Sequence, residues 1–178
     1  NDDYTKWTLT PDAALTPSTA YDATLSYCGG EIDICLLVED LRRRGIHPPI
    51  LLRFNDILRA RIAEITAAFA HSIKEYGYTG AYNPVMPIKV NQQRHVVEQL
   101  VDQGASFGLG LEAGSKPELL VAIALLQREN GLVICNGYKD REYVETALDA
   151  RRLGLDAVIV LDRFAELERV IEASRKLD

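Results

Sequence analysis

The feature that most limits the fold is a regular alternation of short apolar runs with longer helix-like segments. Five times along the chain, a run rich in apolar residues precedes a helix-like segment, and in the longest of these segments, 55–78, apolar residues recur every three or four positions. The predicted strands are 48–54, 85–90, 106–114, 132–136 and 156–162, and the predicted helices are 55–78, 92–104, 115–130, 140–154 and 163–177. A further helix is expected between the N-cap candidate Asp33 and Gly45.

This succession predicts a parallel sheet, because helices between consecutive strands allow right-handed crossovers. Nearly continuous apolar strands also indicate that both faces of the sheet are covered. Two α/β architectures fit: a doubly wound open sheet and a (β/α)8 TIM barrel. A barrel needs eight units and typically about 250 residues, so five units cannot close one. We therefore expect either an open sheet or a partial barrel, the front part of a longer one.

Residues 1–30 differ from the rest of the chain. They are rich in Thr, Ala, Ser, Asp and Pro, and no clear period runs through them. We expect an irregular lead-in with at most short strands, followed by a barrel part that spans residues 31–178.

The charge and the apolar pattern argue against several classes of protein. The formal net charge is −6 and the pI is about 5.1, which favours neither nucleic acid nor an anionic membrane as a partner. No apolar run has transmembrane length, and the first residues lack the basic start and apolar core of a signal peptide. Cys28, Cys35 and Cys135 are odd in number and widely spaced. A reduced, cytoplasmic setting is therefore expected.

Polar residues follow each predicted strand, at the end where parallel α/β folds bind ligands. Strand by strand, they are Arg53 and Asn55; Lys89 and Asn91; Glu112 and Ser115; Asn136, Tyr138 and Lys139; and Asp162 and Arg163. Because the carboxyl ends of parallel strands share one rim, we expect these side chains to form a site.

Lys89 is the sharpest candidate in this set. Its apolar neighbours Met86 and Ile88 would desolvate the amine and disfavour its charged form. A neutral amine can attack a carbonyl and form a Schiff base. On a strand, Lys89 and Asn91 would share one face. The alternative is a strand-end lysine that reaches to water or pairs with Glu112.

The other candidates each carry two interpretations. Glu112 could orient a cofactor or pair with the lysine, or it could be an acid placed near the positive end of the next helix. Gly114 and Ser115 could accept an anion at that helix N-terminus, or form only a turn and a cap. No residue is predicted to bind a metal, since no histidine has a second ligand at metal-binding spacing. The G-x-G at 108–110 lacks the third glycine of a dinucleotide site.

Three stretches occur together in one order: "PIKVNQQRHVVEQLV", "GLGLEAGSKPELL" and "VICNGYKDREYVETAL". With them the chain resembles the biosynthetic, pyridoxal-phosphate-dependent arginine decarboxylases of bacteria and plants. The stretch "EIDICLLVEDLRRRGIHPPILLRFNDILRARI" is similar to the same family's approach to its barrel. The resemblance runs from about Glu31 to the end. It is specific, because the lysine strand and the two turns after the following strands all match.

The resemblance implies a fold, a cofactor and a reaction. The fold would be an alanine-racemase-like (β/α)8 barrel, joined to a β-rich domain. Lys89 stands where the family's lysine binds pyridoxal 5′-phosphate covalently, and Glu112 stands at the family's acidic position near that cofactor. The reaction would be decarboxylation of L-arginine to agmatine in polyamine (spermidine and putrescine) biosynthesis. The family usually also requires Mg²⁺, and the full-length protein would be a homo-oligomer.

Two features depart from the family pattern, and other functions stay open. Met86 stands where a tyrosine is usual, and Asn83 and Pro84 before it are atypical; these positions bear on substrate fit. The family's phosphate and substrate groups would lie beyond residue 178, so this chain alone is expected neither to close its barrel nor to decarboxylate. The alternatives are another pyridoxal-phosphate-dependent decarboxylase or racemase, a Schiff-base aldolase that uses Lys89, and a non-catalytic cofactor-binding fragment.

Overall fold

The computed structural model describes residues 6–15, 27–126 and 130–177. The chain divides into two compact units, Asn1–Ala60 and Arg61–Asp178, each with a hydrophobic cluster of its own. The division between a lead-in and a barrel part at residue 31 stays a prediction, and residues 1–5 and 16–26 of that lead-in lie outside the described ranges. None of the helices in these ranges has the length and apolar content of a membrane-spanning segment.

The first unit pairs two antiparallel strands and adds a helix. Strand β1 (Lys6–Leu15) pairs with β2 (Tyr27–Asp33), so strands occupy part of the segment expected to be irregular. Helix α1 (Ile34–Arg43) follows at once. The Oδ1 atom of Asp33 accepts hydrogen bonds from two backbone N–H groups of its first turn, at 2.8 and 3.2 Å. The predicted N-cap is therefore confirmed.

The strand predicted at 48–54 is wrong. This segment has no strand pairing and runs from α1 to helix α2 (Asn55–Glu75). Its side chains Ile50, Leu52 and Phe54 are partly buried against the cluster of buried residues on β2 and α1. The segment is apolar because alternate side chains pack on that cluster, and not because it belongs to a sheet.

The second unit contains a four-stranded parallel sheet whose order, β3-β4-β5-β6, is the order along the chain. The strands are β3 (Val85–Pro87), β4 (Gly110–Ala113), β5 (Leu132–Cys135) and β6 (Asp156–Ile159). All four were predicted, and each is shorter than its apolar run. The runs extend beyond the strands because neighbouring turns also bury apolar residues, such as Ile88 after β3.

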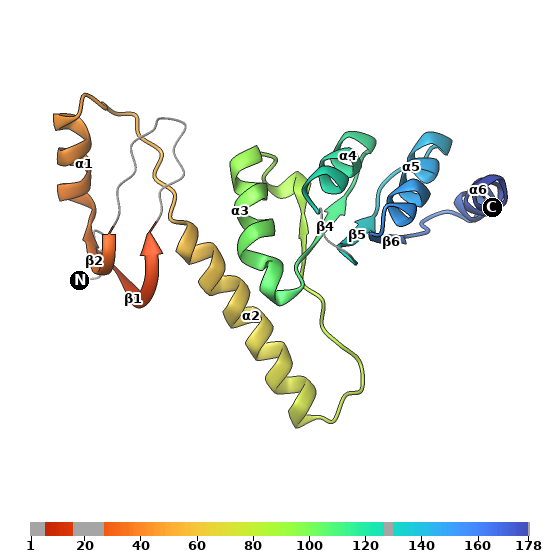
Figure 1. Cartoon of the computed structure of the whole chain (residues 1–178), viewed down its shortest axis with the longest axis horizontal. Coiled ribbons are helices and arrows are strands. Elements are labelled where there is room, and N and C mark those ends of the chain that lie inside the picture. Colours follow the sequence, from red (N-terminus) through yellow and green to blue (C-terminus); the bar gives the residue numbers. More distant parts are fainter. Residues whose placement is uncertain (1–5, 16–26, 127–129, 178) are drawn as a thin grey trace. The chain divides into compact units, whose positions relative to one another are not determined.

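Four helices alternate with these strands: α3 (Arg94–Gly104), α4 (Lys116–Leu125), α5 (Arg141–Arg152) and α6 (Phe164–Leu177). Helix α4 packs against α5, and α5 against α6, so these three helices lie on one face of the sheet (Figure 1). A doubly wound sheet reverses its strand order and so places helices on both faces. Consecutive order with helices on one face is the arrangement of a (β/α)8 barrel. The described part of this unit is therefore a partial barrel.

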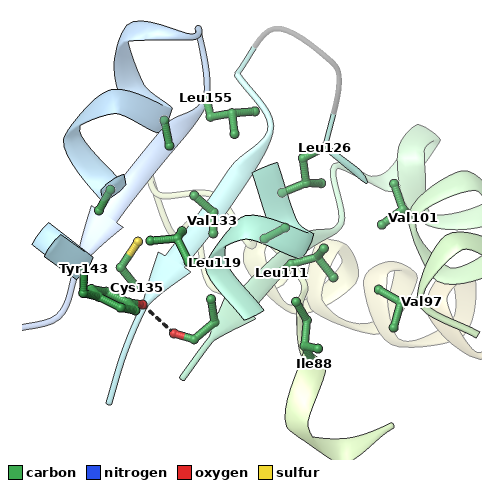
Figure 2. Close-up of a cluster of buried hydrophobic side chains, with 14 residues drawn as sticks. Ile88, Val97, Val101, Leu111, Leu119, Leu126, Val133, Cys135, Tyr143 and Leu155 are labelled. Carbon is green, nitrogen blue, oxygen red and sulfur yellow. Dashed lines mark hydrogen bonds between the residues drawn. The ribbon is translucent and has the colours of Figure 1, made fainter. Parts of the chain in front are cut away.

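The core of the second unit lies between the sheet and its helices (Figure 2). It consists of Ile88, Val97, Val101, Leu111, Ala113, Leu119, Ala122, Leu126, Val133, Cys135, Tyr143, Ala147, Ala150 and Leu155. Each fully buried large apolar side chain contributes roughly 1.5–3 kcal/mol relative to an exposed one. The other face is less covered, since Val158 on β6 is 42% exposed. The prediction that both faces are covered is therefore wrong for β6.

Tyr143 joins helix α5 to the end of strand β4. Its ring packs in the core beside Cys135, and its hydroxyl donates a hydrogen bond of 2.7 Å to the carbonyl oxygen of Ala113 (Figure 2). Burial above all, with the nearby Cys135 thiol, raises the pKa of Tyr143, and burial raises the pKa of Cys135 to about 11. Both groups are thus neutral at pH 7. The tyrosine holds in place the strand end that carries Glu112.

Candidate functional site

A cavity of about 450 Å³ opens at the carboxyl ends of the parallel strands. Its volume falls within the roughly 300–1,000 Å³ usual for small-molecule sites. It is lined by Lys89, Glu112, Gly114, Ser115, Glu118, Asn136, Gly137 and Asp162. Every one of these residues comes from a strand end, the turn after it, or the first turn of the next helix. The prediction that polar groups after successive strands share one site is therefore confirmed for the four strands of this sheet.

Lys89 lies in a turn and not on a strand. Strand β3 ends at Pro87, which has no N–H to continue the ladder, and residues Ile88–Val90 form one turn of 3₁₀ helix. Ile88 is 3% exposed and anchors this turn in the core, while the Lys89 side chain is 62% exposed. The predicted desolvation of the amine is therefore wrong, and so is the face-sharing with Asn91 that a strand would impose.

Lys89, Glu112 and Asn136 meet at the cavity wall. The Nζ atom of Lys89 lies 3.4 Å from Oε1 of Glu112, and Nδ2 of Asn136 lies 3.5 Å from the same oxygen. The predicted pairing of the lysine with Glu112 is thus confirmed. An ion pair with one exposed partner is worth about 1 kcal/mol or less. The amine can therefore leave the carboxylate for another partner at little cost, while the amide keeps the carboxylate in place.

Glu118 is a cavity residue that the sequence analysis missed. Its Oε2 atom accepts a hydrogen bond from the N–H of Gly114 at 2.6 Å, and its Oε1 atom accepts one from Nε2 of Gln92 at 3.0 Å. The Oγ atom of Ser115 accepts from the N–H of Glu118 at 3.5 Å. The turn-and-cap interpretation is confirmed, and the Ser-x-x-Glu pattern of a capping box could have revealed Glu118. Through Gln92, this cap also holds the segment that follows Lys89.

Lys139 was predicted to lie on the rim but is fully buried. It forms an ion pair of 3.2 Å with Glu166, and their side chains are 0% and 2% exposed. Burial opposes ionisation of Glu166, but the N–H of Asp162 and the Lys139 ammonium outweigh it, so the pKa of Glu166 lies below its usual value. No local pattern in the sequence reveals Glu166 as the partner of Lys139. Lys139 lies in the loop before α5 and Glu166 in the first turn of α6, so only the fold brings them together.

The remaining predicted rim residues do not line the cavity. Both Arg53 and Asn55 belong to the first unit: Arg53 lies within the segment that forms no strand, and Asn55 directly follows it. Tyr138 and Arg163 are exposed at the surface, and the Oδ1 atom of Asn91 accepts a hydrogen bond from the N–H two residues later. Among the described residues, no three His, Cys, Asp or Glu side chains gather as metal ligands do.

Comparison with known proteins identifies the family. Residues 61–177, which include every residue that lines the cavity, match the family described as "pyridoxal-dependent decarboxylase, pyridoxal binding domain". The chain belongs to this family. The match covers more than half of the chain and begins where the second compact unit begins.

The similar proteins are arginine decarboxylases by name. The chain is 57% identical over 148 residues to the biosynthetic arginine decarboxylase of Gloeobacter violaceus and 55% identical over 149 residues to that of Thermosynechococcus vestitus. These alignments cover 83% and 84% of this chain but only 23% of each relative. The crystal structure of the biosynthetic arginine decarboxylase from Campylobacter jejuni superposes with a TM-score of 0.78 at 32% identity, and covers 98% of this chain and 28% of that one. The chain thus spans about a quarter of the length of these relatives.

The cavity residues fit the cofactor of this family. Pyridoxal phosphate is an aldehyde that joins proteins through a lysine amine. Lys89 offers such an amine at an open cavity, loosely paired and mostly exposed. Glu112 and Asn136 add a carboxylate and an amide beside it. Among the described residues of the cavity, Lys89 is the one cationic side chain, and its amine suits the aldehyde end of the cofactor.

Proposed function

We propose that this chain is the lysine-bearing part of a decarboxylase that converts L-arginine to agmatine and carbon dioxide for polyamine synthesis. The proposal rests on the family, on the names of relatives that are 50–57% identical, and on the position of Lys89. We further propose that residues 31–178 form the N-terminal part of the barrel domain, after a lead-in of residues 1–30.

The observation that carries the proposal is the lysine at the cavity. Lys89 is the one amine among the described residues that line the cavity, and its weak pairing with Glu112 leaves it available for a covalent bond to an aldehyde. The buried side chain of Ile88 anchors the 3₁₀ turn in the core, so the backbone of Lys89 is fixed although its side chain is mostly exposed. We propose Lys89 as the cofactor attachment site and as a catalytic residue.

The chemistry divides between the cofactor and the residues. Bound pyridoxal phosphate supplies an electron sink for the pair left when the carboxylate departs as carbon dioxide. Glu112 would accept a proton from Nζ of Lys89 when the lysine is not bonded to the cofactor. Asn136 would keep Oε1 of Glu112 directed toward that amine. The protein's contribution is thus to fix the attachment point and to keep a proton acceptor beside it.

Further proposals concern the whole protein. Its substrate would be a small basic amino acid, L-arginine, and neither nucleic acid nor a membrane would be a partner, in keeping with the net charge of −6. We propose a homo-oligomer in the cytoplasm, with Mg²⁺ as a second requirement. The few, odd-numbered and widely spaced cysteines of the sequence support this setting.

The attachment site can be tested by chemical trapping. The full-length protein would be loaded with pyridoxal phosphate, reduced with borohydride, digested and mapped by mass spectrometry. The pyridoxyl group is expected on the peptide that contains Lys89, and Lys89→Ala should abolish it. Lys116→Ala is the matched control. Lys116 is the first residue of helix α4, its Nζ atom lies 3.4 Å from Oδ2 of Asp140, and it does not line the cavity. A pyridoxyl group on another lysine in the wild-type protein would refute the assignment.

The substrate needs a separate assay. Carboxyl-labelled arginine, ornithine and lysine would be compared as sources of labelled carbon dioxide, with agmatine measured as the product from arginine. Release from arginine is expected to exceed release from the other two. Formation of D-arginine without loss of carbon dioxide would show a racemase instead. The 178-residue chain by itself is expected to release none.

A further inference from the structure

The buried pair of Lys139 and Glu166 has no role in the proposed chemistry. Lys139 lies in the loop between β5 and α5, and Glu166 lies in the first turn of α6. Their charged groups are 3.2 Å apart, and both side chains are withdrawn from water. Neither residue lines the cavity. Burying two charges has a large desolvation cost, so the presence of this pair away from the cavity lining requires a structural explanation.

The pair holds the backbone of two cavity-lining residues. The Nζ atom of Lys139 donates a hydrogen bond to the carbonyl oxygen of Gly137, which follows β5. The Oε2 atom of Glu166 accepts one from the N–H of Asp162, which follows β6, at 3.0 Å. Gly137 and Asp162 both line the cavity. One ion pair therefore ties together two separate loops that form one wall.

Further contacts make this arrangement specific. The N–H of Arg163 lies 3.4 Å from Oε2 of Glu166, and Nη1 of Arg169 donates to the carbonyl oxygen of Lys139 at 2.8 Å. Gly137 has φ of +82°, and a Cβ there would collide with the backbone of Gly114. The loop after β5 is thus confined between the loop after β4 and the ion pair.

Stability alone does not account for the pair. Removing two buried charges from water opposes their mutual attraction, so well-packed apolar residues of similar size are often equally stable or more so. What an apolar pair cannot supply is the donor for Gly137 and the acceptor for Asp162. The geometry therefore favours a role in fixing these two backbone positions.

We propose that Lys139 and Glu166 are a positioning pair, which sets the part of the cavity wall formed by Gly137 and Asp162 and thereby the affinity of the cavity for pyridoxal phosphate. The inference rests on the proposed function, since it takes this cofactor as the occupant of the cavity. Neither residue touches the cofactor in this scheme. Both act through the backbone of Gly137 and Asp162.

The test uses the full-length protein and measures cofactor binding, not turnover. A double variant, Lys139→Met with Glu166→Leu, removes both charges and both backbone hydrogen bonds while filling a similar volume. It is expected to fold, because no lone charge remains buried, and to bind pyridoxal phosphate about tenfold more weakly than the wild type. Arg141→Ala with Glu145→Ala is the control, because it removes an ion pair of α5 whose residues do not line the cavity. Its dissociation constant should stay within about twofold of the wild type.

Each result has a defined meaning. A folded double variant that binds the cofactor as tightly as the wild type overturns the positioning role. If the double variant does not fold, Glu166→Asp decides, because it keeps the buried charge but draws the carboxylate away from the N–H of Asp162. Weaker binding by that variant supports the role, and unchanged binding overturns it. A wild-type protein that carries no pyridoxyl group on Lys89 after reduction refutes the proposed function itself, which is a separate result.

Discussion

Replacement of Tyr143 by Phe would test how the end of strand β4 is held. The change removes the hydroxyl that donates to the carbonyl oxygen of Ala113 at 2.7 Å and leaves the buried ring in place. That oxygen also accepts a hydrogen bond from the N–H of Asn136 at 2.9 Å, so it is not left without a partner. The loss is therefore that of one net hydrogen bond, about 1 kcal/mol, and not the larger penalty of an orphaned polar group.

Amide hydrogen exchange of the strands β4 and β5 would measure this loss. A decrease of about 1 kcal/mol in the free energy of opening speeds exchange of the slowest amides about fivefold. Tyr138→Phe is the matched control, because Tyr138 undergoes the same chemical change in the loop before α5 but is 65% exposed. Its effect should stay below about 0.5 kcal/mol.

Two results would contradict this reasoning. Unchanged exchange in Tyr143→Phe would mean that the hydroxyl contributes nothing beyond what water supplies to the unfolded chain. A loss of about 3 kcal/mol or more, the size expected for a buried acceptor left alone, would mean that the second hydrogen bond to Ala113 does not form.

Three further predictions concern Glu166, the cysteines Cys35 and Cys135, and Gly137. The pKa of Glu166 is lower in the fold than its ordinary value of 4.5, so its stabilising effect is complete above pH 4.5 and is lost as the pH falls through the folded value. The free energy of opening of α6, measured by hydrogen exchange at several pH values, should therefore decrease below about pH 4.5, and should decrease less steeply in Glu166→Gln. Iodoacetamide at pH 8 should label the exposed Cys35 but not Cys135, which is fully buried and has a pKa raised to about 11, and peptide mapping would resolve the two sites. Gly137→Ala should weaken binding of pyridoxal phosphate, measured by titration, since a Cβ at φ of +82° would strike the loop after β4.

The barrel-like order of the second unit was predictable because a helix-like segment separates each apolar run from the next. The failure at 48–54 has a physical origin. A short apolar run shows that a segment is covered, but it does not show what covers it. Ile50 and Leu52 pack against buried residues of β2 and α1, so these side chains are partly withdrawn from water without belonging to a sheet.

The sequence predicted which strand ends form the candidate site, but it did not predict the burial or the partners of the individual side chains. Four strand ends could be aligned from the sequence, and this placed Lys89 and Glu112 together correctly. Whether Lys89 was buried depended on where β3 stops, which Pro87 decides. The partnership of Lys139 with Glu166 depended on two loops meeting in space, and no spacing along the chain carries that information.

The consecutive order of the strands has a consequence for synthesis on the ribosome. Each new strand of the second unit pairs with the strand made just before it, so none has to wait for a distant partner. Lys89 emerges first and Asp162 last among the residues that line the cavity. At roughly 5–20 residues per second, the whole rim is translated within about 4–15 seconds. Such a site can be assembled by successive addition while elongation continues, because the edges of β3, β4 and β5 that pair with the next strand are covered once that strand is made.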